Sequence, residues 1–246
     1  MKLCNCKKFP LNLNNHLYEA INEEGRNKNF SLAGKMVNLW RPERNLKVSF
    51  KLFSTNPKLV EEILFVANEW SHHCSISFVY EKQPELADIF VSTKNNLGFY
   101  SAIGLQSKVL ISKNKTSMNL DPTWGLEEGF SNSQKFKHKY CKSLVLHEFG
   151  HALGLVHEHQ REDRPFNLNI NYIRKNFKKM GMPTFEIAKE NIINTYDPKS
   201  ILKSRFDYKS IMIYPLNKET ITENFQIKIP WELSKIDKRK ISKIYP

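Results

Sequence analysis

Apolar and polar residues alternate over one early stretch of the chain, which predicts a β-strand. Its apolar positions are Leu46, Val48, Phe50 and Leu52. After Pro57, apolar residues recur at helical spacing through LVEEILFVANEW, so we expect a helix of about three or four turns. Further short apolar runs predict strands at 76–80, 87–91 and 109–112. The first half therefore reads as a twisted sheet backed by a helix.

Helical spacing dominates the second half. A long helical stretch runs from His138 to Leu155 and contains a glycine near its end that can terminate it. Downstream, the pattern predicts two short helices, a turn and an amphipathic C-terminal helix, at 169–180, 184–196, 206–215 and 232–245. We therefore expect an α+β fold with an N-terminal twisted mixed sheet, a backing helix and a mostly helical or irregular C-terminal part.

Length and composition are those of one globular domain: 246 residues, of which 40% are hydrophobic. The longest apolar run, Ile63 to Ala67, is far shorter than the roughly 20 residues of a membrane span. The N-terminus has no apolar segment of about 7 to 15 residues, so no secretory signal peptide is visible. We expect export by another route, and a cytoplasmic location stays open.

The net charge of +13 suits acidic partners, but lysines are spread along the whole chain rather than gathered in one patch. No nucleic-acid-binding signature accompanies them. We therefore expect a monomer that binds neither nucleic acid nor membrane. Cys74 and Cys141 could form a disulfide or remain thiols, and their spacing does not decide between the two.

Four of the eight histidines lie between 147 and 159, in the spacing H-E-x-x-H-x-x-G-x-x-H. His147 and His151 are four residues apart on the predicted helix, so both imidazoles project from one face and can hold one ion. Gly154 permits a sharp turn at positive φ, which brings back His157 as a third ligand. Three neutral nitrogens with an open coordination position are typical of a catalytic zinc site.

Glu148 follows the first ligand and is placed to act on a water at the open position. Zinc would lower the pKa of that water and polarise a peptide carbonyl, while Glu148 accepts the proton as general base and delivers it to the leaving amine. The pattern predicts a zinc-dependent endopeptidase that uses one Zn²⁺ ion. The alternative is a zinc-containing module that binds peptides without cleaving them.

The segment HEFGHALGLVH resembles the zinc signature of the metzincin peptidases. Its continuation, with Glu158, Arg161, Asp163 and Arg164, resembles the HExxRxDR sequence of astacins. SIMIY at 210–214 resembles the astacin Met-turn, although Ile213 stands where that family commonly has histidine. The resemblance implies a metzincin fold, an apolar floor beneath the metal formed by Met212, and a stabilising hydroxyl for the oxyanion from Tyr214.

Further segments resemble landmarks of bacterial-type members of the family: Leu39-Trp40, NEW at 68–70, ADIFV at 87–91 and SMNL at 117–120. The resemblance thus extends from about residue 36 to the end. It implies a catalytic domain over 36–246, with an upper lobe at about 36–154 and a lower lobe at about 155–246. In that family the segment matching 87–91 is an edge strand, on which an extended protein or peptide substrate could lie. Lys218 is a candidate for favouring an acidic residue in a pocket beyond the Met-turn.

Residues 1–35 read as a leader or pro-like segment. Astacin propeptides present an aspartate to the zinc, but the first aspartate here is Asp88, so the hypothesis for this segment is a thiolate cap from Cys4 or Cys6. The alternative is a disordered tail or one that only packs against the domain. In astacins the counterpart of Glu158 pairs with the matured N-terminus; the alternative is a solvated loop residue or a residue with a local arginine partner. The additional histidine, His159, is expected to be an exposed loop residue.

Overall fold

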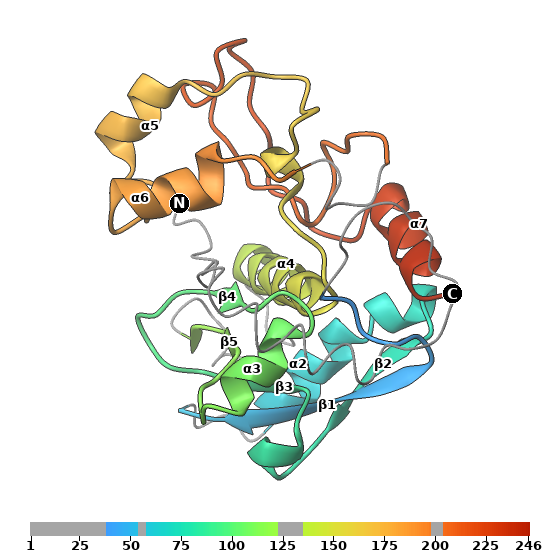
Figure 1. Ribbon diagram of the computed structural model, residues 1–246. Helices are drawn as coiled ribbons and strands as arrows, with labels where there is room; N and C mark the ends of the chain where they lie inside the picture. Colours follow the sequence, from blue (N-terminus) through green and yellow to red (C-terminus); the bar gives the residue numbers. More distant parts are fainter. Residues whose placement is uncertain (1–37, 54–57, 123–134, 198–203) are drawn as a thin grey trace.

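A computed structural model describes residues 38–53, 58–122, 135–197 and 204–246. The predicted leader, with Cys4 and Cys6, lies outside these ranges. Within them the fold is α+β, as the sequence predicted, with a mixed sheet on one side of a long helix and short helices on the other (Figure 1). The strands are β1 Arg44–Lys51, β2 Ile76–Tyr80, β3 Ile89–Ser92, β4 Tyr100–Ser101 and β5 Met118–Asn119.

The sheet has the order β2-β1-β3-β5-β4, and only the pairing of β4 with β5 is antiparallel. In β1, Leu46 and Val48 are fully buried while Asn45 and Lys47 are exposed, which confirms the predicted strand and its inward face. The prediction that 87–91 forms an edge strand is wrong. β3 lies inside the sheet because β5, too short to show an alternating pattern, pairs beyond it and carries β4 outward.

The strand predicted at 109–112 is also wrong, because this segment belongs to helix α3, Gln106–Ile111. Its buried residues are Ser107, Leu110 and Ile111, spaced as on one face of a helix. A short run of apolar residues fits either a strand or a buried helical turn. Gly104, with a φ of +50°, precedes the helix. A Cβ at Gly104 would lie 1.7 Å from the backbone oxygen of Asn38, so only glycine fits.

Helix α2 packs against β2 and against the long helix α4, and α3 packs against β3. The predicted helix after Pro57 is shorter than expected, because α2 ends at Ala67 and a separate 3₁₀ turn follows at Trp70–His73. None of the helices in the described ranges is long and apolar enough to cross a membrane. The helices are α2 Leu59–Ala67, α3 Gln106–Ile111, α4 Lys135–Ala152, α5 Ile170–Asn176, α6 Phe185–Ala188 and α7 Lys235–Ile244.

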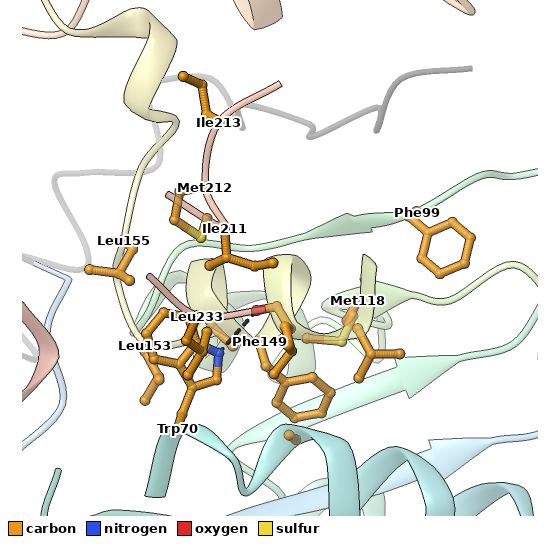
Figure 2. Close-up of a cluster of buried hydrophobic side chains, with 14 of the residues drawn as sticks. Trp70, Phe99, Met118, Phe149, Leu153, Leu155, Ile211, Met212, Ile213 and Leu233 are labelled. Atoms are coloured by element: carbon orange, nitrogen blue, oxygen red, sulfur yellow. Dashed lines mark hydrogen bonds between the residues drawn. The ribbon is translucent and has the colours of Figure 1, made fainter. Parts of the chain in front are cut away.

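One hydrophobic core joins the sheet side to the second half of the chain. Trp70 is fully buried at its centre, and its indole N–H donates to the carbonyl of Leu146 in α4 at 3.0 Å. Figure 2 shows Ile211 and Met212, from the second half of the chain, in the same cluster as Trp70, and a Cβ added at Gly150 in α4 would contact both Met212 and Trp70. Residues from both halves therefore surround α4, which fixes its position. Cys141 is buried in the same core, and Cys74 and Cys141 are both thiols.

The C-terminal end of α4 is held by side chains from both ends of the described chain. Trp40 Nε1 donates to the carbonyl of Ala152 at 2.7 Å, and the hydroxyl of Tyr245 donates to the carbonyl of Leu153 at 2.8 Å. These carbonyls have no partner within the helix, so distant donors satisfy them. The last turn of α4 therefore has a fixed direction where the chain leaves it.

Candidate metal centre

Helix α4 presents His147 and His151 on one face, with ring centroids 4.8 Å apart. Gly154 follows with a φ of +93°, the left-handed conformation that the sequence predicted. A Cβ at this position would lie 2.5 Å from Cδ2 of Leu39. The turn brings in His157, whose Nε2 lies 3.1 Å from Nε2 of His151. The three histidines offer nitrogen atoms within 4.8 Å of one another.

The second ring nitrogen of each histidine contacts an oxygen that can only accept a hydrogen bond. Each Nδ1 therefore carries the proton and donates it, which leaves the Nε2 lone pair available to a metal. The contacts are His147 Nδ1 with Ile211 O at 2.8 Å, His151 Nδ1 with Leu155 O at 2.8 Å, and His157 Nδ1 with Gln160 Oε1 at 2.9 Å. Gln160 is a site residue that the motif alone did not identify; its distance of three residues from His157 is the available signal.

Burial favours the neutral form of all three rings. It lowers the pKa of His147 to about 4, and it lowers the pKa of His151 and His157 well below the ordinary value, with the neighbouring histidines adding to the effect. Nε2 of His147 is buried and has no hydrogen-bond partner within the described residues. A buried, unsatisfied nitrogen beside two others of the same tautomer fits one zinc ion.

Glu148 is completely buried on α4, directly after the first histidine. Met212 lies against the same helix at Gly150, where an added Cβ would be 2.4 Å from its sulfur atom. Glycine at 150 thus lets Met212 approach the helix that carries two of the histidines. The motif leaves this position unspecified, so Gly150 was missed by sequence reasoning.

Tyr214 is buried, and its ring packs against the site. Its centroid lies 4.3 Å from that of His157, 4.5 Å from that of His159 and 5.9 Å from that of His147. The residues predicted to form the centre are therefore brought together: the histidines, the glutamate beside them and the Met-turn tyrosine.

The prediction that His159 is exposed is wrong, because its side chain is fully buried. Its Nδ1 accepts from the backbone N–H of Tyr214 at 3.3 Å, and its Nε2 therefore donates to the carbonyl of Asn191 at 2.9 Å. The ring also stacks on Tyr214. Asn191 is 32 residues away in sequence, so local pattern gave no signal of this burial.

Glu158 is buried and paired within the described chain. One carboxylate oxygen accepts from Arg161 Nη1 at 3.2 Å and from the N–H of Asp207 at 3.1 Å, and the other accepts from Lys240 Nζ at 3.1 Å. Arg161 also forms two parallel hydrogen bonds to Asp163, at 2.8 and 2.7 Å. Arg161 is the local arginine partner that the sequence offered as an alternative, and the burial of Glu158 excludes a solvated loop residue. No local pattern indicates Lys240.

A pocket adjoins His147 and is lined mainly by apolar side chains from α4, the Met-turn and the segment before α7. Ile213 lines it and is almost fully buried; Figure 2 shows this side chain set apart from Met212. Lys218 is exposed and is not among the pocket residues. The lining residues are Tyr140, Ser143, Leu144, His147, Ile211, Ile213, Tyr214, Pro215, Ile229 and Pro230.

Comparisons with known proteins agree with this geometry. Residues 133–245 match the family model described as Astacin, a family of peptidases. Zinc metalloproteinase nas-14 of Caenorhabditis elegans is 31% identical over 117 residues, a match that covers 43% of this chain and only 21% of the nematode protein. The chain thus spans about a fifth of that relative's length.

Solved structures match over most of the fold. Myroilysin aligns with a TM-score of 0.72 and 26% identity, covering 87% of this chain and 98% of the other. High choriolytic enzyme 1 of Oryzias latipes, a hatching enzyme zinc-protease, aligns with a TM-score of 0.55 and 19% identity, covering 87% and 96%. The second likeness concerns the fold alone. The chain is therefore astacin-like: residues 133–245 match the astacin peptidase family, and they are part of an astacin-type metzincin fold.

Proposed function

We propose that the chain is a zinc-dependent endopeptidase. One observation carries the proposal: three buried histidines direct unprotonated Nε2 atoms to one point, because fixed acceptors hold the proton on each Nδ1. His147, His151 and His157 would hold one Zn²⁺ ion and leave a coordination position open. When bound, zinc would lower the pKa of a water molecule and polarise the carbonyl of the scissile peptide bond.

The other side chains perform the proton transfers and stabilise charge. Glu148 accepts a proton from the attacking water as general base and delivers it to the amine nitrogen as the C–N bond breaks. Tyr214 donates its hydroxyl proton in a hydrogen bond to the oxyanion that forms at the former carbonyl. Met212 supplies an apolar floor, and Gly154 supports the turn to the third ligand. Glu158 supports the loop after that ligand through Arg161 and Lys240.

We further propose two lobes, 36–154 and 155–246, with the substrate bound between them. The elements of the first range lie on one side of α4, and α5 and α6 lie on the other (Figure 1).

The role of residues 1–35, the Cys4 or Cys6 cap and the site of action outside or inside the cell stay predictions. The structure describes neither these residues nor a contact of Glu158 with the N-terminus.

A peptide substrate would extend the sheet at β4. This strand pairs with β5 on one side, ends the sheet in the described part of the chain and contacts α4. An extended peptide can bind by adding to the strand that ends a sheet. β4 thus replaces the segment at 87–91 in this role. A single copy of the chain would be enough to bind a peptide in this way, as expected for a monomer.

The pocket beside His147 would receive an apolar side chain of the substrate next to the scissile bond. Its walls include Leu144, Ile213 and Ile229, and among the described residues that line it none is charged, since the ring of His147 is neutral. Cleavage sites in a peptide library would show apolar residues at one position beside the cut. Lys218→Ala would leave this preference unchanged. An acidic preference that disappears in Lys218→Ala would contradict the proposal.

Replacement of Glu148 tests the function itself. Glu148→Gln keeps the size of the side chain and removes the base, so peptide cleavage should fall by about 10²–10⁴-fold while zinc stays bound at one ion per chain. A module that binds peptides without cleaving them predicts zinc in the wild-type protein and no cleavage. Undiminished cleavage by Glu148→Gln, or zinc-loaded wild type without cleavage, would overturn the proposal.

A further inference from the structure

Asp237 is a buried carboxylate that the proposed reaction does not use. It lies in the first turn of α7, and it is 1% exposed. Oδ1 accepts from the hydroxyl of Ser210 at 2.7 Å. Oδ2 accepts from the N–H of Ile211 at 2.7 Å and from the N–H of Ser234 at 3.0 Å. Two of these three donors belong to the Met-turn, so the carboxylate joins α7 to the segment beside the metal centre.

The contacts continue from this carboxylate to a metal ligand. The hydroxyl oxygen of Ser210 accepts from the N–H of Met212 at 3.1 Å. That N–H and the carbonyl of Ile211 belong to the same peptide group, and the carbonyl accepts from Nδ1 of His147 at 2.8 Å. An unbroken series of hydrogen bonds therefore leads from Asp237 through Ser210 and one peptide group to His147.

We propose that Asp237 is a positioning residue for the metal ligand His147, acting through Ser210 and the Ile211–Met212 peptide group. Each hydrogen bond in such a series polarises the next, so a negative charge at Asp237 makes the Ile211 carbonyl a stronger acceptor. A stronger acceptor at Nδ1 fixes the ring and raises the basicity of Nε2 toward the metal. The relay thus does for His147 what a carboxylate in direct contact does at other zinc sites.

The hydrogen bonds that Asp237 accepts from Ser210, Ile211 and Ser234 stabilise its ionised form. Both N–H groups donate to Oδ2, and the N-terminal end of α7 adds a favourable dipole. Burial raises the pKa of Asp237, while these hydrogen bonds and the charge of Lys240 oppose the rise. The Ser210 hydroxyl then donates to the carboxylate and keeps a lone pair for Met212.

Asp237 also caps α7, and the two roles need to be separated. Ser234 and Asp237 form a reciprocal capping box at the start of the helix. Ser234 makes no contact with His147 or with the Ile211–Met212 peptide group among the described hydrogen bonds. Ser234→Ala therefore weakens the cap and leaves the relay in place, whereas Ser210→Ala breaks the relay and leaves the capping box intact.

The test measures zinc affinity of the full chain by competition with a chelating dye, at a temperature where every variant is folded. This inference rests on the zinc centre proposed above, and zinc binding by the wild-type protein is its reference. Ser210→Ala and Asp237→Asn should each weaken zinc binding by about 10–100-fold. The double variant should lose no more zinc affinity than the single variant that binds zinc more weakly, because both substitutions break the same relay. Ser234→Ala should lower the melting temperature and change zinc affinity by less than about twofold.

Three results would overturn the inference. Folded Ser210→Ala with wild-type zinc affinity would exclude the relay even if Asp237→Asn does not fold. An equal loss of affinity in Ser234→Ala would assign the effect to the cap. A wild-type chain that binds no zinc would remove both the relay and the proposed function, whereas the first two results leave the proposed function standing.

Discussion

At the scale of single residues, the centre is shaped by buried groups that leave few alternative positions. The ring of Tyr214 packs against both His157 and His159, and its backbone N–H donates to His159. The ring position therefore depends on packing, whereas the proposed contact with the oxyanion depends on the hydroxyl. The two contributions can be separated by removing the hydroxyl alone.

Tyr214→Phe keeps the ring and removes the oxyanion donor. We expect kcat for peptide cleavage to fall by about 10²–10³-fold with KM and zinc affinity close to wild type, because the hydroxyl would act in the transition state. Steady-state kinetics and zinc titration measure this. Tyr208→Phe, at a partly exposed tyrosine, is the matched control and should be neutral. Wild-type kcat in Tyr214→Phe would remove the tyrosine from the mechanism.

Gly150→Ala tests the close approach of Met212 to α4. The new Cβ would lie 2.4 Å from the Met212 sulfur and 3.2 Å from Cζ2 of Trp70, so one of them must move. We expect the free energy of unfolding to fall by about 1–3 kcal/mol. Urea denaturation measures this, and the penalty should shrink in a Met212→Ala background, where the sulfur is absent. An unchanged free energy would show that Met212 yields without cost.

The positions of individual site residues could be predicted from the sequence where local backbone geometry determines them. The helical spacing of His147 and His151 and the turn at Gly154 follow from backbone geometry alone. The burial of His159 did not follow, because its partner Asn191 arrives from a distant π-helical turn. The acceptor of the His147 proton was equally hidden, because Ile211 is 64 residues away, whereas Leu155 and Gln160 lie four and three residues after their histidines.

At the scale of elements, helix α7 contacts two segments beside the metal centre through its polar side chains. It supplies Asp237 to the Met-turn and Lys240 to Glu158, and its N-terminus carries a complete capping box. Its amphipathic pattern predicted the helix, as the alternation of apolar and polar residues did for β1. The contacts of its polar face were not predictable, because they depend on how the helix packs. The strand predicted at 109–112 was wrong because four residues are too few to distinguish the period of a strand from that of a helix.

Lys240→Ala tests the contribution of α7 to the buried carboxylate of Glu158. Glu158 would keep Arg161 and lose the ammonium group, so we expect the free energy of unfolding to fall by about 1.5–3 kcal/mol. Lys238→Ala is the matched control: it makes the same charge change on the same helix, at an exposed side chain. Equal denaturation midpoints for the two variants would mean that Lys240 contributes nothing specific.

At the scale of the whole molecule, both halves of the chain build one core around α4. Trp40 and Tyr245, near opposite ends of the described chain, hold the last turn of this helix. The sequence predicted the α+β arrangement, but the order of strands in the sheet depended on β4 and β5, which have two residues each. Such short strands form because their neighbours provide the pairing, and no local pattern marks them.

Removal and return of the metal tests the central claim most directly. Purified full-length chain should cleave a peptide substrate, lose at least about 99% of its activity when a chelator removes zinc, and recover on addition of one equivalent of Zn²⁺, because the zinc-polarised carbonyl and activated water are then restored. Cleavage sites should remain internal to the peptide throughout. Full activity in metal-free protein would contradict the account, as would zinc-loaded protein that leaves every peptide intact.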